Sequence, residues 1–396
     1  MPCSNRSPPV DEGDVTWVIP VRDRAAELAR LLESIGTDRT IVVVDDGSLD
    51  PAAVAAVAAS HGAALVALPA NVGPASARNA GLRTVTTTYV VFVDSDVVLD
   101  ANPLPVLLGH FADPRVAMVA PRIRGLVQRG RDNWIARYED ARSSLDLGLR
   151  SATVRPRSPV SWVSSTFLVA RVDALEGGFS EGMRVGEDVD LVWNLCERGW
   201  RVRYEPAASV RHAHRTEVRE WMARKTFYGT GAHPLAMRHP RNIAPAILAP
   251  WSAGVLLALL AQRRWSVPLA LGISAVAAVN IAGKLTRSEH PLRDGVALTA
   301  SGVGASLSQG MALLVRHWWP LTVVLALFSR RVRRAAVLAS VVDIALEYGR
   351  TGARLDPVRF GVARRLDDLA YGLGVWLGAL RGRSLAALLP DVRRRG

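Results

Sequence analysis

Two pairs of carboxylates stand directly after apolar runs of the sequence. Asp45 and Asp46 follow a run of isoleucine and valine, and Asp94 and Asp96 follow residues 89–93. A carboxylate at the end of a buried strand can accept hydrogen bonds from a ribose or a base, as in nucleotide-binding α/β sheets. Two carboxylates separated by one residue also suit Mg²⁺ or Mn²⁺, which share the phosphate oxygens of a nucleotide. Each motif alone is also typical of a turn, but the two together indicate a cation-dependent nucleotide site.

Other charged residues would complete such a site. Arg78 lies about one turn into a predicted helix that Gly-Pro opens, where it suits a diphosphate, although a surface salt bridge is the alternative. Glu187, Asp188 and Asp190 begin another predicted helix, and acidic residues in a first turn commonly serve only to cap it. Beside a nucleotide site, one of these carboxylates is available to deprotonate an attacking hydroxyl.

Basic residues further along the chain have weaker signals. His212 follows a strand-like valine and is a candidate metal ligand, although an isolated histidine is more often a surface residue. Arg224 and Lys225 precede two closely spaced glycines, so they are candidates for a mobile cationic flap over phosphates. The alternative for Arg224 and Lys225 is that they are interfacial charges that precede a membrane-associated region.

The elements that must position these residues follow an alternating pattern. Residues 15–21 and 40–44 are expected to be buried strands, with an amphipathic helix at 25–35 between them. Helix-like stretches separate the apolar runs that follow. This order predicts an α/β domain with a mostly parallel, doubly wound sheet, in which ligands bind where the strands end. The further expected strands are 64–68, 89–93, 116–120, 160–170 and 201–205.

The charge of +13 is confined to the second part of the chain. Residues 1–240 hold 28 basic and 28 acidic side chains, whereas residues 241–396 hold 21 and 8. These arginines flank apolar runs instead of alternating with aromatic residues, so we expect an anionic membrane surface as the partner and no nucleic acid. An abundance of apolar residues and only two cysteines exclude a disordered chain and a disulfide scaffold.

Three long runs after residue 243 contain no charged residue. They cover residues 243–261, 265–283 and 295–315, and each is long enough to cross about 30 Å of hydrocarbon as a helix. The alternative is core helices of a soluble domain, because the first two runs contain prolines. The arginines that follow would anchor the region to anionic headgroups; they are Arg330, Arg331, Arg333 and Arg334.

Four regions are predicted along the chain. Residues 1–13 form a flexible N-terminus, 14–240 a catalytic domain, 241–330 an apolar helical and membrane-embedded region, and 331–396 a basic amphipathic helical region. The first twelve residues lack the apolar stretch of a signal peptide. We therefore expect a protein of the cytoplasmic membrane with its catalytic domain on the cytoplasmic side.

Five motifs follow one another along the chain: Ile19-Pro20-Val21, Asp45-Asp46-Gly47-Ser48, Ala77-Arg78-Asn79-Ala80-Gly81, Asp94-Ser95-Asp96 and Gly186-Glu187-Asp188-Val189-Asp190-Leu191. Together they resemble the inverting family 2 glycosyltransferases of the GT-A fold, over roughly residues 14–232. Within this family the chain is similar to the glycosyltransferases of the mycofactocin system, through residues 186–191 and 210–240 followed by an apolar region.

The resemblance implies a role for each candidate residue. Asp188 is expected to be the catalytic base, and Asp96, assisted by Asp94 and His212, is expected to bind Mg²⁺ or Mn²⁺. The expected acceptor or flap residues are Glu187, Asp190, Arg224 and Lys225. The expected residues for the nucleotide-sugar donor are Pro20, Val21, Asp45, Asp46, Arg78, Asp94 and Ser95.

The same resemblance implies a reaction. Glucose would pass from a UDP-sugar onto a small peptide-derived redox cofactor and build a short β-linked oligosaccharide. One departure lies at Val21-Arg22-Asp23-Arg24, where many members have an aromatic residue, Asn and Glu. The glutamine and tryptophan motif of processive polysaccharide synthases is also missing, which disfavours long-chain synthesis.

Three alternatives remain open from the sequence. The first is a membrane-anchored glycosyltransferase for a lipid or a cell-envelope glycan, and the second is a nucleotidyltransferase, which shares the sheet and the acid pairs. The third is a polytopic transporter with a nucleotide-sensing cytoplasmic domain. A transporter is disfavoured because the three longest apolar runs contain no ionisable residue.

Overall fold

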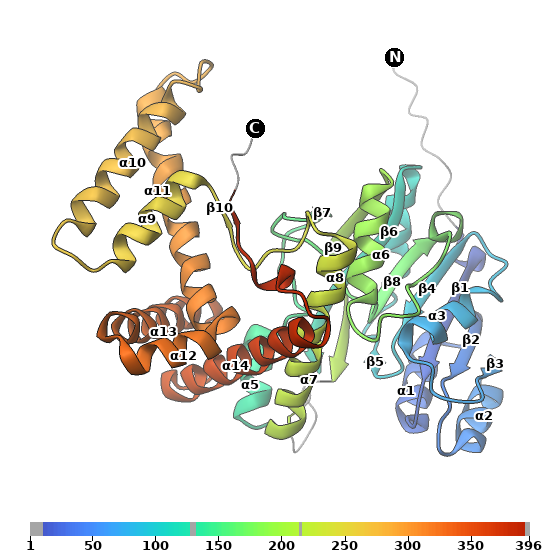
Figure 1. Cartoon of the computed structure of the whole chain (residues 1–396). Coiled ribbons are helices and arrows are strands. Elements are labelled where there is room, and N and C mark those ends of the chain that lie inside the picture. Colours follow the sequence, from blue (N-terminus) through green and yellow to red (C-terminus); the bar gives the residue numbers. More distant parts are fainter. Residues whose placement is uncertain (1–10, 127–131, 214–215, 393–396) are drawn as a thin grey trace, which may run out of the picture. The chain divides into compact units, whose positions relative to one another are not determined.

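The computed structural model describes residues 11–126, 132–213 and 216–392. The chain forms two compact units, which divide after Glu217 (Figure 1). The sequence predicts this division near residue 240, but helices α7 (Val218–Thr230) and α8 (Ala232–Arg238) belong to the second unit. Helix α7 packs so tightly along α14 (Pro357–Arg381) that a Cβ on Gly229 would lie 2.2 Å from the carbonyl oxygen of Tyr371.

A twisted sheet forms the centre of the first unit (Figure 1). Among the residues described it has nine strands, in the order β3-β2-β1-β4-β8-β6-β9-β5, with β7 paired to β9. The strands are β1 (Val15–Val21), β2 (Thr40–Asp45), β3 (Ala64–Ala67), β4 (Tyr89–Val93), β5 (Val97–Val98), β6 (Val116–Leu126), β7 (Ala152–Val154), β8 (Phe167–Arg171) and β9 (Arg201–Ala213).

The sheet is entirely parallel in its first half and mixed in its second. Strands β1 to β4 pair in parallel, as the alternating pattern predicts, and β6 pairs in parallel with β9. Strand β8 lies between β4 and β6 and is antiparallel to both. The expectation of a mostly parallel sheet therefore holds for the first four strands, while the sheet as a whole is mixed.

Helices cover both faces of the parallel half. Leu28 and Leu31 of α1 (Ala25–Ile35) belong to one core cluster with Trp17 and Ile19 of β1. The alternate residue Val18 faces α3 (Pro74–Leu82), so the period of two along the strand sends side chains to opposite faces. The remaining helices of this unit are α2 (Pro51–Ser60), α4 (Leu104–Leu108), α5 (Trp134–Arg142) and α6 (Glu187–Glu197), with 3₁₀ turns at Glu12–Asp14, Gly109–Ala112 and Val172–Leu175.

The second unit is almost entirely helical. In it α9, α10 and α11 lie side by side (Figure 1). After α7 and α8 come α9 (Pro250–Leu260), α10 (Ser266–Ala282), α11 (Pro291–Ala312), a π-helical turn (Leu313–His317), α12 (Trp319–Phe328), α13 (Arg330–Thr351), α14 and a 3₁₀ turn (Ala386–Leu388), while β10 (Ile247–Leu248) pairs with β11 (Asp391–Val392).

Two of the three predicted spanning segments form helices shorter than expected. Residues 243–261 include strand β10 and the proline that begins α9, so only eleven of them are helical, and α10 has 17 residues. The run 295–315 lies within one continuous helix, Pro291–His317. Among the described residues, this is the helix whose length and apolar composition would allow it to cross a membrane.

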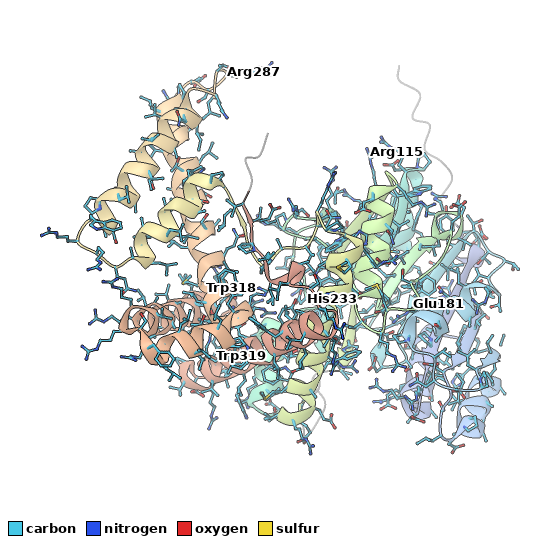
Figure 2. The ribbon with its side chains drawn as sticks, viewed as in Figure 1. Arg115, Glu181, His233, Arg287, Trp318 and Trp319 are labelled. Atoms are coloured by element: carbon cyan, nitrogen blue, oxygen red, sulfur yellow. The ribbon has the colours of Figure 1, made fainter. Side chains whose placement is uncertain are left out.

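Hydrogen bonds from tryptophan side chains connect the later helices of this unit. Trp318 and Trp319, labelled in Figure 2, stand at the start of α12, and their indole nitrogens donate to the carbonyl oxygens of Leu388 and Leu369 at 2.8 and 3.1 Å.

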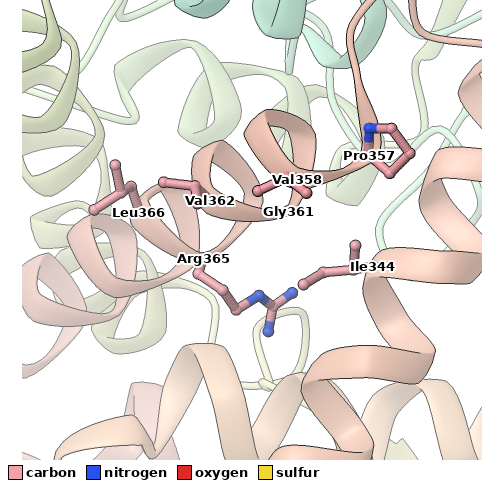
Figure 3. Close-up of a pocket in the computed structure, with 7 residues that line it drawn as sticks. All are labelled: Ile344, Pro357, Val358, Gly361, Val362, Arg365 and Leu366. Atoms are coloured by element: carbon pink, nitrogen blue, oxygen red, sulfur yellow. The ribbon is translucent and has the colours of Figure 1, made fainter.

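A shallow apolar hollow lies between α13 and α14, with Arg365 at its edge (Figure 3). The other residues that line the hollow are Ile344, Pro357, Val358, Gly361, Val362 and Leu366.

Candidate active site

The carboxylates at the end of β2 accept hydrogen bonds from the loops around the strand ends. Both oxygens of Asp46 accept hydrogen bonds from backbone amides, from Val72 at 2.7 Å and from Gly73 at 3.1 Å, and the side chain is buried. Asp45 accepts a hydrogen bond from the backbone amide of Ser48 at 3.0 Å. In the structure these residues therefore hold the segment that leads into α3, and their predicted contact with the donor stays a prediction.

Gly47 allows the loop after β2 to approach the loop before α3. Its φ is +68°, and a Cβ at this position would lie 2.6 Å from the backbone of Asn71. An L side chain would therefore be both strained and in collision with the backbone. Together with Asp46, this glycine fixes the point at which α3 begins.

Arg78 connects two acidic motifs that are far apart in the sequence. Its guanidinium donates to Asp94 at 2.7 Å and to Glu187 at 3.0 Å, and it lies 5.5 Å from the ring centre of Phe179. Burial alone would lower the pKa of this guanidinium, but the two carboxylates raise the pKa, so it is charged. The alternative of an ordinary surface salt bridge is wrong, because Arg78 is only 3% exposed.

Asn79 fixes the loop that precedes α6. Its side-chain amide donates to the carbonyl of Phe179 and accepts from the backbone amide of the same residue, both at 2.8 Å. It also donates to Glu181, labelled in Figure 2, at 3.1 Å. Asn79 belongs to the motif around Arg78, yet the motif by itself does not identify this partner, because the partner lies 100 residues later.

Asp96 lies against two cationic side chains of its own unit. The short strand β5 pairs with β9 in the register Val97 to His212, which brings the His212 Nε2 to 3.3 Å from Asp96 Oδ1. The guanidinium of Arg24, at the start of α1, contacts the other carboxylate oxygen. Burial would raise the pKa of Asp96, but the charges of His212 and Arg24 outweigh it and hold that pKa well below its usual range.

The cluster contains the ligand types that a hard divalent cation prefers. Asp94 and Asp96 offer carboxylate oxygens, and His212 offers an imidazole nitrogen, Nε2. Its other ring nitrogen, Nδ1, is buried and has no hydrogen-bond partner among the described residues. The described residues contain no group of three or more such side chains placed to hold a metal by themselves. This set fits an ion that takes its remaining ligands from a bound nucleotide. In this structure, the positively charged guanidinium of Arg24 forms an ion pair with Asp96.

Asp188 is the carboxylate whose environment suits proton transfer. One of its oxygens accepts from the backbone amide of Val189 at 2.8 Å, and the other lies 3.4 Å from the amide of Ser165. Burial and the neighbouring charge of Glu187 raise its pKa to about 7, against the opposing effect of Arg78. A carboxylate with a pKa near neutrality can both take up and release a proton under physiological conditions.

The remaining predicted residues have different surroundings. Pro20 and Val21 end β1, where the Val21 carbonyl accepts from the amide of Asp46 at 2.9 Å, and Ser95 is buried between the two carboxylates of its motif. Asp190 is 1% exposed and accepts from Ser180 and Asn194. These bonds hold Asp190 within its own unit, and its predicted contact with the acceptor stays a prediction.

The two predicted flap residues belong to the second unit. Lys225 is buried on α7, 3.7 Å from Asp367 of α14 and 5.8 Å from the ring centre of Trp221. The guanidinium of Arg224 lies 5.5 Å from the ring centre of Tyr228. Both side chains therefore have partners within their own unit, and a flap formed by them stays a prediction.

The residue that sequence reasoning missed in this site is Arg24. It lies in the segment Val21-Arg22-Asp23-Arg24, which departs from the family pattern, so the resemblance assigned it no role. The signal that points to Arg24 is a cation in the short loop after β1, at the edge of the sheet where the acidic strand ends meet.

Comparison with known proteins gives a match over almost the whole chain. Residues 16–175 match the sequence model of glycosyl transferase family 2. The chain is 44% identical to the pre-mycofactocin glycosyltransferase of Mycobacterium tuberculosis in an alignment 396 positions long, which covers 96% of this chain and 82% of that protein.

Two further matches have lower sequence identity. The poly-beta-1,6-N-acetyl-D-glucosamine synthase of Staphylococcus aureus is 25% identical over 176 residues, 43% of this chain and 42% of that protein. Among solved structures, a mannosyltransferase from Pyrobaculum calidifontis in complex with GDP-Man and Mn²⁺ has a TM-score of 0.44 at 23% identity, and the match covers 76% of this chain and 88% of that one.

Proposed function

The chain belongs to glycosyl transferase family 2, and we propose that it moves glucose from UDP-glucose onto a hydroxyl group of a peptide-derived acceptor, with inversion at the anomeric carbon. One observation carries this proposal. Arg78 joins Asp94, beside the cation-binding candidate Asp96, to Glu187, which adjoins a carboxylate of pKa about 7 at Asp188. The groups that would hold the donor and deprotonate the acceptor therefore form one connected cluster.

The acceptor is proposed from the relative that matches nearly the whole chain. That relative is named for pre-mycofactocin, and its identity of 44% extends over 96% of this chain. We therefore propose the same peptide-derived redox cofactor as the acceptor here, and a short β-linked oligosaccharide as the product.

Asp188 would act as the general base in a single displacement. The acceptor oxygen attacks the anomeric carbon, the bond from that carbon to the diphosphate oxygen breaks with its electron pair, and the hydroxyl proton passes to Asp188. Attack from the face opposite the leaving group turns an α-linked donor into a β-linked product. Arg78 would hold Asp94 and Glu187 in place during this step, because its buried guanidinium contacts both.

A divalent cation would complete the donor site. Asp96, Asp94 and His212 are the residues that would hold Mg²⁺ or Mn²⁺ in this unit. When bound, such an ion neutralises the negative charge that develops on the departing diphosphate.

The second unit is proposed to associate with an anionic membrane surface. Large apolar side chains are exposed along α10, and they include Val267, Leu269, Leu271, Val276 and Val279. Phe328 is 85% exposed at the end of α12, two residues before Arg330, and four of the first five residues of α13 are arginines. Apolar side chains beside clustered arginines suit the interface of an anionic bilayer. We propose the cytoplasmic membrane, with the catalytic unit on its cytoplasmic side.

A donor panel tests the reaction. The full-length protein is incubated with UDP-glucose, UDP-galactose, UDP-N-acetylglucosamine and GDP-mannose, with Mg²⁺, Mn²⁺ or EDTA, and with the peptide-derived cofactor as acceptor. We expect acceptor-dependent release of UDP from UDP-glucose, loss of turnover in EDTA, and a product heavier by one or more hexoses. A product that carries a nucleotide would instead identify a nucleotidyltransferase, and turnover in EDTA would refute the metal requirement.

A further inference from the structure

We propose that Arg24 occupies Asp96 in the donor-free enzyme and leaves it when the divalent cation and the sugar nucleotide bind together, so that Arg24 couples cation binding to donor binding. This inference rests on the proposed role of Asp96 as a metal ligand. It concerns a residue for which neither the sequence pattern nor the family resemblance supplied a function.

The first step is that both oxygens of Asp96 are engaged within the chain. The Arg24 guanidinium contacts Oδ2, and His212 Nε2 lies 3.3 Å from Oδ1. An incoming divalent ion must therefore displace Arg24 or bind beside a fixed positive charge. Either course weakens the binding of the bare ion, because like charges a few ångströms apart repel strongly in a partly buried site.

The second step is that the segment carrying Arg24 is held in place by its neighbours. Asp23 has a φ of +56°, which is unusual for a residue other than glycine. Its backbone amide donates to Ser48 Oγ at 2.9 Å, and its carboxylate accepts from the amide of Leu49 at 2.6 Å. These bonds tie the backbone of this segment to the loop after β2, so Arg24 starts from a defined position at the sheet edge.

The third step is that Arg24 is the partner that can move. Its side chain is 37% exposed, whereas that of Asp96 is 14% exposed and lies on the short turn between β4 and β5. A rotation of the arginine side chain costs little when water can solvate the guanidinium. If Asp96 binds a cation that bridges a diphosphate, that diphosphate lies within reach of the released guanidinium, which suits phosphate oxygens.

Titration with Mn²⁺ alone tests the competition without any turnover. Free Mn²⁺ is measured by its paramagnetic resonance signal in the full-length protein without nucleotide. We expect Arg24→Gln to bind Mn²⁺ about tenfold more tightly than the wild type, because the competing charge is removed. Arg24→Lys keeps the charge and should stay within about threefold of the wild type.

Two control variants separate this inference from the proposed function. Arg30→Gln removes an exposed charge from α1 that pairs with Glu27, and it should leave Mn²⁺ affinity unchanged. Asp96→Asn should abolish the tight site. If Asp96→Asn abolishes binding but Arg24→Gln leaves it unchanged, the competition is refuted while the metal role of Asp96 stands. If Asp96→Asn has no effect, the metal role itself fails and this inference falls with it.

Addition of UDP tests the coupling. In the wild type, saturating UDP should tighten Mn²⁺ binding, because the diphosphate both supplies ligands and attracts Arg24 away from Asp96. In Arg24→Gln the gain from UDP should be smaller by about tenfold, since the bare ion already binds well. An equal gain in both proteins would overturn the coupling.

Discussion

The carboxylate of Asp188 is half-buried and lies beside the acidic Glu187, and both features raise its pKa. Replacement of Asp188 by asparagine keeps the shape of the side chain but removes its ability to take up a proton. We expect the rate of transfer to fall by about 10²- to 10⁴-fold, with donor affinity nearly unchanged. UDP release and UDP-glucose binding are measured in parallel, and Glu33→Gln on the exposed side of α1 serves as the control. Turnover close to that of the wild type would exclude Asp188 as the base.

The raised pKa of Asp188 predicts opposite effects of pH on activity and stability. Because the base must be unprotonated, kcat/KM should rise with pH and level off above about 7. The pKa of Asp188 is near 3.8 in the unfolded chain and about 7 in the folded protein, so the folded protein keeps the Asp188 proton to a higher pH. The stability that protonated Asp188 contributes is therefore lost as the pH rises towards and through about 7. Compared with wild type, Asp188→Asn should therefore gain in thermal midpoint between pH 5 and pH 8. A constant difference across that range would contradict the raised pKa.

The sequence predicts single site residues better than the contacts between residues that lie far apart along the chain. Asp188 and Asp96 were predicted as the base and the main metal ligand, and these roles remain predictions, but the structure gives each a suitable environment. The backbone partners of Asp46 could not be predicted, because they lie 26 and 27 residues away on a loop without a regular pattern. Arg24 was missed because its contact with Asp96 spans 72 residues and depends on how two loops fold together.

At the scale of elements, α3 is the helix whose position matters most to the site. It carries Arg78, and its Gly81 approaches β1 so closely that a Cβ would lie 2.4 Å from Val18 Cγ1. We expect Gly81→Ala to push the helix from the sheet and to destabilise the first unit by about 1–3 kcal/mol. Urea unfolding followed by tryptophan fluorescence measures this change. Gly109→Ala is the matched control, because among the described residues its Cβ would have only its own neighbours in the chain within 4 Å.

The elements of the parallel half were predicted well from local pattern. The expected strand at 15–21 and helix at 25–35 agree with β1 and α1 in both bounds, and the α/β fold with a helical C-terminal unit is confirmed. Later strands were placed less well: the strand expected at 201–205 extends to Ala213, and the one expected at 160–170 begins only at Phe167. Hydrophobic periodicity reports burial, but the antiparallel partners of β8 are decided by tertiary contacts that the pattern does not encode.

At the scale of the whole molecule, the exposed apolar and basic surface of the second unit predicts binding to anionic vesicles. Substitution of Arg330, Arg331, Arg333 and Arg334 by glutamine should weaken binding to phosphatidylglycerol vesicles by about 10²- to 10³-fold, because each arginine near the surface contributes about 1 kcal/mol. Flotation of the full-length protein measures this. The control replaces four exposed arginines of the first unit, Arg30, Arg83, Arg115 and Arg198. Equal binding of both variants would reject the proposed anchor.

The pairing of α7 with α14 has a practical consequence for anyone who wishes to produce the catalytic unit alone. A recombinant fragment that stops near residue 240 would retain α7 yet lack α14, which would strip Lys225 of Asp367 and leave Gly229 facing water. Such a fragment should be prone to precipitation. A fragment that ends at Glu217 stops at the boundary between the two compact units and should be more soluble.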